Sequence, residues 1–270
     1  MRSDFIALAL GIAAIAPAFA EQEPEGRAAF IQASIAYHQG AYDDCISGYR
    51  QTIALHHEVP FSKMMIARCY SLKGDVDNGI TALDDASEFE FPNAQLLANN
   101  DEFANLRKDS RFPDILAKVR ANARPCPARA RRRQFDFWVG QWDVTDAQGG
   151  SVGTDLIEPD QDGCLLRETY TGANGGTGKS STFYDRLTGY WRQVWMDASG
   201  IDQDLFGDFV DGSAVLRQVT YNGGLKTIVT YTYAPQADGT VKQVIRRSVD
   251  DGETWTVIGD YTYTRKAPQP

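Results

Sequence analysis

The sequence predicts a two-domain α+β protein, in which a helical-hairpin repeat precedes an antiparallel up-and-down β-barrel of about ten strands. Between residues 27 and 120, apolar side chains recur every three or four positions, as in amphipathic helices. From Phe135 onwards, runs of apolar, aromatic and threonine residues alternate with short Gly, Asp and Asn turns. We therefore expect the helical domain over residues 21–120, a linker over 121–134 and the barrel over 135–267.

The first 20 residues are predicted to be a secretory signal. An apolar run from Phe5 to Ala16 follows Arg2, and Ala18 and Ala20 form the small-x-small pattern that signal peptidase recognises. The run is about a dozen residues long, whereas a membrane-spanning helix needs roughly 20. We expect a periplasmic or secreted mature chain without a membrane span.

Both predicted domains are acidic. The formal net charge of the chain is −9, with −6 over residues 21–120, +5 over 121–134 and −8 over 135–270. Because acidic surfaces repel phosphate backbones, we expect no nucleic-acid partner. The Pro- and Arg-rich linker is interpreted as a solvated hinge, with an anionic docking patch as the alternative.

A spacing of 34 residues relates two segments of the helical domain. It separates Gly40 from Gly74, and each glycine permits the left-handed turn that closes a helical hairpin. The same offset relates further pairs: Ala33 and Ala67, Cys45 and Gly79, Tyr49 and Leu83. The small residues at positions 33, 45, 67 and 79 would allow paired helices to approach closely.

This pattern resembles the tetratricopeptide repeat over about residues 26–90. Gly40, Tyr42, Cys45 and Tyr49 correspond to its turn glycine, first aromatic, small residue and second aromatic, while His57 replaces its terminal proline. The resemblance implies a groove that binds a protein or peptide. Further helices over 94–120 are expected to cap the short stack.

Four cysteines are present, at positions 45, 69, 126 and 164. Disulfides are plausible in an exported protein, but the sequence alone leaves three pairings open. Buried free thiols at Cys45 and Cys69 are the alternative. No Cys-x-x-Cys motif occurs, so no metal site is predicted.

The β half begins with Gly140-x-Trp142, which looks like the opening motif of lipocalin-like barrels. In that family the tryptophan closes one end of the barrel beneath an arginine of the last strand. Arg265 is the expected partner here and Arg246 the second candidate, with a cation–π contact joining the pair. Short turns leave no room for parallel crossovers, which agrees with this fold.

A longer pattern resembles uncharacterised secreted bacterial domains related to the lipocalins. It includes Asp136 to Trp142, Asp162 to Cys164, Glu168 and several positions between Tyr184 and Gly200. The resemblance implies a fold but no established activity. Related barrels that hold haem use a histidine ligand, but the last histidine of this chain is His57, so no cofactor is expected.

Two other motifs are interpreted as turns. Residues 248–255 match the Asp-box pattern, and a single copy is expected to staple a hairpin. Residues 173–180 match a relaxed phosphate-loop pattern, but the following residues read as a strand where a nucleotide site needs a helix. This segment is therefore expected to be a hairpin loop at the mouth of the barrel.

The functional hypothesis is a non-enzymatic binding protein, because no nucleophile–base constellation occurs. The barrel would hold a small apolar or amphipathic ligand, and the helical repeat would bind a protein partner. Candidate ligand-binding residues are Glu168, Tyr184, Gln193 and Trp195, although a shift of one residue in strand parity would replace the whole set. The alternatives are a protein-interaction scaffold with a filled barrel, and a carboxylate-dependent hydrolase of the cell envelope.

Overall fold

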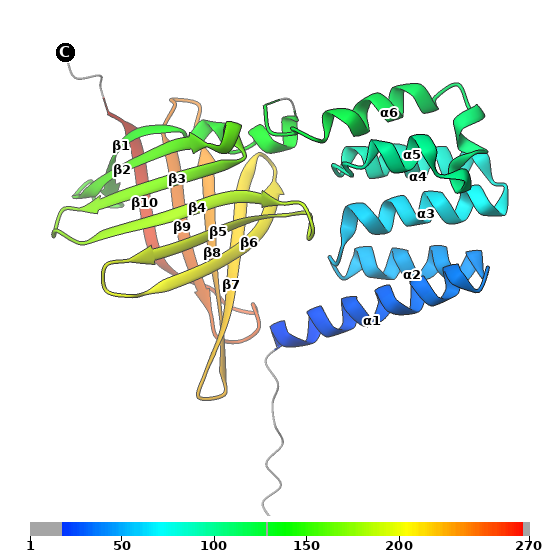
Figure 1. Cartoon of the computed structure of the whole chain (residues 1–270). Coiled ribbons are helices and arrows are strands. Elements are labelled where there is room, and N and C mark those ends of the chain that lie inside the picture. The colour runs from blue at the N-terminus through cyan, green and yellow to red at the C-terminus, as the bar shows by residue number, and fades with distance from the viewer. Residues whose placement is uncertain (1–17, 128, 267–270) are drawn as a thin grey trace, which may run out of the picture.

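The computed structural model describes residues 18–127 and 129–266, and it joins a stack of helices to a closed β-barrel (Figure 1). Most of the expected signal, residues 1–17, lies outside the described residues. The order of elements confirms the predicted α+β architecture.

Six α-helices form the described helical part. They are α1 (Ala18–His38), α2 (Tyr42–Ala54), α3 (Val59–Lys73), α4 (Val76–Glu88), α5 (Ala94–Asn99) and α6 (Phe112–Ala121). Each of the first four packs against its neighbour in the chain, so the stack consists of successive hairpins (Figure 1). Gly40 and Gly74 end α1 and α3 with φ of 73° and 83°, the left-handed geometry expected of these turns.

Small residues let the stacked helices approach closely. A Cβ added to Gly48 of α2 would lie 2.8 Å from the Cβ of Ala33 in α1. The related positions Cys45, Tyr49, Ala67 and Leu83 are all buried in the same core. A disulfide between Cys45 and Cys69 joins α2 to α3, so these cysteines are not free thiols.

Ten antiparallel strands close into a barrel, as predicted. They are β1 (Gly140–Asp146), β2 (Ser151–Asp160), β3 (Leu165–Gly172), β4 (Thr177–Asp185), β5 (Tyr190–Asp197), β6 (Asp202–Val210), β7 (Ser213–Asn222), β8 (Leu225–Pro235), β9 (Val241–Ser248) and β10 (Thr256–Arg265). Each strand pairs with its neighbour in sequence, and β1 pairs with β10 so that Trp142 lies opposite Arg265. Closure leaves no unpaired sheet edge.

Both motifs interpreted as turns lie in hairpins. Residues 173–176 connect β3 to β4, so a strand follows the phosphate-loop-like segment. In the β9–β10 turn, the Asp250 carboxylate accepts a hydrogen bond from the Thr254 amide at 2.9 Å. The Trp255 indole donates to the Gly252 carbonyl at 3.0 Å, which completes the hairpin staple.

The segment between the two parts is packed, and the expectation of a solvated hinge is wrong for Arg132. This side chain is 9% exposed and donates to the Glu90 carboxylate and, at 2.9 Å, to the Tyr184 carbonyl. Glu90 lies 42 residues earlier in the chain, so the linker composition could not reveal this partner. Arg131 pairs with Asp208 of β6 at 2.7 Å, so this arginine too has a partner within the chain.

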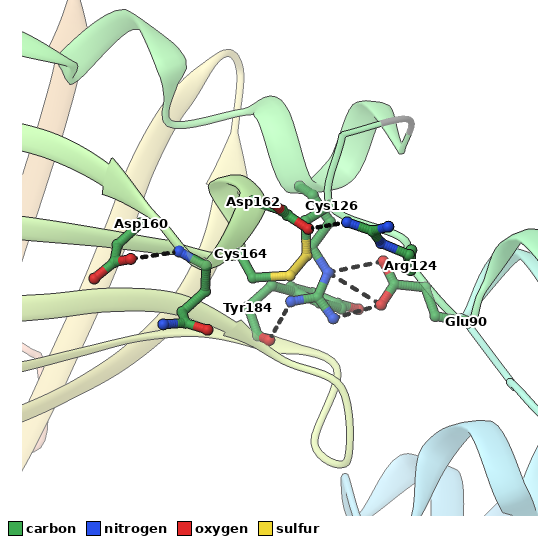
Figure 2. The surroundings of a disulfide bond; sticks show 9 residues. Glu90, Arg124, Cys126, Asp160, Asp162, Cys164 and Tyr184 are labelled. Carbon is green, nitrogen blue, oxygen red and sulfur yellow. Dashed lines mark hydrogen bonds and ion pairs between the residues drawn. A yellow bond between two sulfur atoms is a disulfide. The ribbon is translucent and has the colours of Figure 1, made fainter.

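The helical part contacts one end of the barrel. A second disulfide, Cys126–Cys164, ties the linker to the β2–β3 connection beside Glu90 and Tyr184 (Figure 2). The Val59 amide at the start of α3 donates to the Leu187 carbonyl of the β4–β5 turn at 2.9 Å. The His56 ring stacks on Tyr190 with centroids 3.9 Å apart. Covalent, polar and aromatic contacts thus join the two parts.

Candidate ligand-binding site in the barrel

The barrel encloses a cavity of about 290 Å³. Its wall is aromatic and polar, and is formed by Val144, Val152, Glu168, Tyr170, Gln193, Trp195, Gln203, Tyr231, Tyr233, Gln243, Ile245, Tyr261 and Tyr263. Alternate residues of a strand point to the same face, which places these side chains inside. The wall includes three of the four residues expected from the sequence: Glu168, Gln193 and Trp195.

Tyr184 is the exception among the expected ligand-binding residues. Its side chain is buried but does not line the cavity. It packs at the end of the barrel nearest the helices, where the Arg131 guanidinium lies 4.8 Å from its ring centroid. Burial raises the pKa of Tyr184 to about 12, so its hydroxyl remains neutral. Tyr184 therefore belongs to the junction between the two parts.

Small residues on β4 make room for the cavity wall. Glu168 of β3 lies opposite Ser180, which in turn lies opposite Trp195 of β5. A Cβ added to Gly178 would lie 2.0 Å from the Trp195 indole, so the ring occupies the space above this glycine. Gly178 belongs to the phosphate-loop-like motif, and its role here is to accommodate the Trp195 side chain.

The expected closure motif lies at the same end as Tyr184, the end nearest the helices. Trp142 is fully buried, and the Arg265 guanidinium lies 4.5 Å from the centroid of its ring. Arg265 also donates to the Val139 carbonyl at 3.0 Å. Trp138, for which no closure role was predicted, is equally buried, and its carbonyl accepts from the Trp142 indole at 2.8 Å. Two tryptophans thus close this end.

The cavity continues toward the end remote from the helices. A second hollow, of about 490 Å³, lies between the β3–β4 and β5–β6 turns and is lined by residues such as Asn174 and Ser199. It shares Val152, Tyr170 and Trp195 with the inner cavity. These three residues therefore lie where the barrel interior meets its mouth.

A hydrogen-bond network covers the cavity wall around Glu168. The Ser180 hydroxyl donates to the Glu168 carboxyl, and Gln193 Nε2 lies 3.4 Å from the same oxygen. Gln193 Oε1 accepts from the Tyr233 hydroxyl at 2.8 Å. The Tyr263 hydroxyl donates to Gln243 Oε1 at 3.3 Å. The network presents both donors and acceptors to the cavity.

A second carboxyl, Asp155 of β2, lies beside Glu168. Asp155 is 3% exposed, and its carboxyl interacts with the Glu168 carboxyl. Burial raises the pKa of Asp155 to about 6. Burial and the negative charge of Asp155 raise the pKa of Glu168 well above its usual range. Both carboxyls therefore resist ionisation, and a negative charge on one opposes ionisation of the other.

Asp155 and the tyrosines of the wall are not among the residues predicted from the sequence. A signal for the tyrosines exists, since Tyr231-x-Tyr233 and Tyr261-x-Tyr263 place two aromatic residues on one face of a strand. Asp155 lies between Thr154 and Leu156, where only the strand parity indicates that it points inward.

No family model matches this chain. No curated protein matches its sequence at a significant level either. Over the part of the chain that the structure describes, no helix is long and apolar enough to cross a membrane. Within those same residues, no group of three or more His, Cys, Asp or Glu side chains is arranged to hold a metal ion.

Proposed function

We propose that the barrel binds a small amphipathic molecule and that the protein is not an enzyme. The observation that carries this proposal is the cavity of about 290 Å³, whose wall combines aromatic rings with hydrogen-bonding groups. Such a composition is typical of ligand sites, where an apolar surface supplies affinity and a few polar groups supply orientation.

The polar wall favours an amphipathic ligand over a purely apolar one. Glu168, Gln193 and Gln243 are each less than 10% exposed. An apolar ligand would remove water from these groups without replacing its hydrogen bonds, which costs free energy. A ligand that carries donors or acceptors avoids this cost.

A hydrolase and a scaffold remain the alternative functions. Two carboxyls converge in the barrel, as a carboxylate-dependent hydrolase would need, but only Glu168 reaches the cavity wall. Asp155 does not line the cavity, so it would not contact a substrate there. A scaffold needs no cavity, so the hollow interior gives that alternative no support.

We propose that the helical part is tetratricopeptide-like and the barrel lipocalin-like. The hairpins closed by Gly40 and Gly74, and the Trp142–Arg265 contact, support these family assignments. A hollow of about 370 Å³ on α2, α3 and α4, lined by residues such as Arg50 and Tyr70, is the proposed docking site for a protein partner. A photo-crosslinker at Tyr70 should capture that partner, whereas one at exposed Asp114 should not.

We propose that the protein works in the periplasm or outside the cell. Its four cysteines form two disulfides, which are typical of oxidising compartments. Cell fractionation should place the protein outside the cytoplasm, with a mass that lacks residues 1–20. A cytoplasmic protein that retains these residues would contradict this.

Native mass spectrometry of the protein isolated from its own cells tests the ligand proposal. The wild type should carry a bound small molecule. Ile245→Trp, which fills the cavity, should abolish it, whereas Val257→Trp at a position that is 53% exposed should not. A ligand-free wild type, or an added mass that persists in Ile245→Trp, would contradict the proposal.

A further inference from the structure

We propose that the ligand of the barrel is an organic cation, a small protonated amine whose ammonium group binds the Glu168 carboxylate while its apolar body packs against Trp195 and Ile245. This inference rests on the proposed function and specifies its ligand class. It starts from the charge of the cavity. Lys, Arg and His are absent from the residues that line it, and Glu168 is the acidic residue among them.

The Asp155–Glu168 pair differs from the other deeply buried acid of the described chain. Glu90 is 2% exposed, and the Arg132 guanidinium neutralises it. Asp155 and Glu168 are 3% and 6% exposed, yet no ion pair forms with either within the described residues. Buried charges are normally paired, because a lone buried charge is costly. A cationic ligand would supply the missing partner.

Geometry places both carboxyls on the inner face of the barrel. Asp155 lies opposite Tyr170 in the β2–β3 register, and Glu168 lies opposite Ile157, one step along the same face. Tyr170 and Glu168 both line the cavity. The Asp155 carboxyl therefore lies beside Glu168 on the neighbouring strand. An ammonium at Glu168 would interact with the charge of both.

The aromatic wall suits a cation as well. The rings of Tyr170 and Trp195 lie 6.1 Å apart by centroid and tilt toward each other at 57°. Tyr231 and Tyr261 lie on the opposite side of the cavity wall, on β8 and β10. Aromatic faces attract ammonium groups and also pack against apolar carbon. Entry through this mouth would bring the ligand past these rings to Glu168.

Binding of the amine would displace the proton of the carboxyl pair. The N–H groups of the ammonium would donate to the Glu168 carboxylate, and a proton held by the Asp155–Glu168 pair would leave for solvent. The titratable groups that face the pair from neighbouring strands are Tyr170, Tyr233 and Tyr263. Burial raises the pKa of each above its usual value, so they remain neutral. Amine binding should therefore strengthen as pH rises from 5 to 8.

Isothermal titration of the full chain with three matched probes tests the inference. The probes are 2-phenylethylamine, 2-phenylethanol and 3-phenylpropionate, which share one body but are cationic, neutral and anionic. We expect the amine to bind at least tenfold more tightly than the alcohol, and the carboxylate not to bind. Glu168→Gln should reduce the preference for the amine below threefold. Asp143→Asn, which removes an exposed carboxylate from β1, should leave that preference unchanged.

The outcomes separate this inference from the proposed function. Equal affinity for amine and alcohol would overturn the amine assignment while leaving a ligand-binding barrel. So would tight binding of a divalent metal ion that Glu168→Gln abolishes. If the native ligand is identified by mass spectrometry and carries no basic nitrogen, the inference fails. The comparison of probes uses the wild type, so it decides the question even if Glu168→Gln does not fold.

Discussion

The Arg132 guanidinium lies against the Glu90 carboxylate between the helices and the barrel, with Nε 2.9 Å from Oε1 and Nη2 2.5 Å from Oε2. The two side chains are 8% and 2% exposed. Removing one member of a buried pair leaves the other charge without a partner. The contact therefore joins segments that are remote in sequence and makes the junction sensitive to substitution.

Arg132→Ala should lower the free energy of unfolding by about 3–5 kcal/mol, because it leaves the Glu90 charge buried and unpaired. Urea denaturation followed by circular dichroism measures the change. Arg124→Ala is the matched control, since Arg124 and its partner Asp162 are exposed, and it should change little. Equal effects of the two substitutions would show that the buried pair has no special role.

Gly140→Ala should destabilise the barrel by roughly 1–3 kcal/mol. Gly140 has φ of 144°, and an added Cβ would lie 2.5 Å from Arg265 Nη1. In the Arg265→Ala background the steric part of this cost should disappear, so the two substitutions should be non-additive in a double-mutant cycle. Additive effects on thermal unfolding would rule out the proposed clash.

Asp155→Asn should change the pH dependence of stability in a defined direction. The folded state raises the pKa of Asp155 from 3.8 to about 6, so between these values the folded state binds more protons than the unfolded one. Stability therefore falls as pH rises through this window, by about 3 kcal/mol at most. Below pH 3.8 the Asp155 carboxyl is protonated in both the folded and the unfolded state, so its burial does not lower the free energy of unfolding.

Urea denaturation at pH 4 to 8 measures this effect as the difference between wild type and Asp155→Asn. The variant should gain stability relative to the wild type as pH rises from 4 to 6. Glu158→Gln, on an exposed position of the same strand, should show no such gain. Parallel curves for wild type and Asp155→Asn would mean that burial of Asp155 carries no cost.

Gly178→Ala should displace the Trp195 indole, because the added methyl would occupy the position of the ring. We expect a changed tryptophan emission spectrum and at least a tenfold loss in affinity for 2-phenylethylamine, the proposed type of ligand. Lys179→Ala, at the adjacent exposed position, should retain both the spectrum and the affinity. Unchanged affinity in Gly178→Ala would show that the position of Trp195 does not matter for binding.

Periodicity and turn residues sufficed to predict the fold. Gly40 and Gly74 close helical hairpins, and the strand pattern after Phe135 produces the barrel. Both signals are local in sequence, so they are readable without a structure. Residues 121–134 were misinterpreted because the charge partner of Arg132 is remote in sequence.

The candidate site was predictable in part. Strand parity reveals which side chains point inward, and it correctly groups Glu168 with Gln193. Parity does not reveal how deep along the barrel axis a side chain lies. It therefore did not show that Tyr184 lies at the end nearest the helices, outside the cavity. Asp155 of β2 lies diagonally next to Glu168 of β3, and only the register brings such residues together.

The disulfide between Cys126 and Cys164 determines which end of the barrel faces the helices and which end is left open to solvent and to a ligand. It attaches the helices to the end of the barrel that the buried Trp138 and Trp142 side chains close, so a ligand would not enter through the attached end. The β3–β4 and β5–β6 turns at the far end surround the entrance. The helices attach to the closed end, so a protein bound to them would leave the mouth of the barrel uncovered.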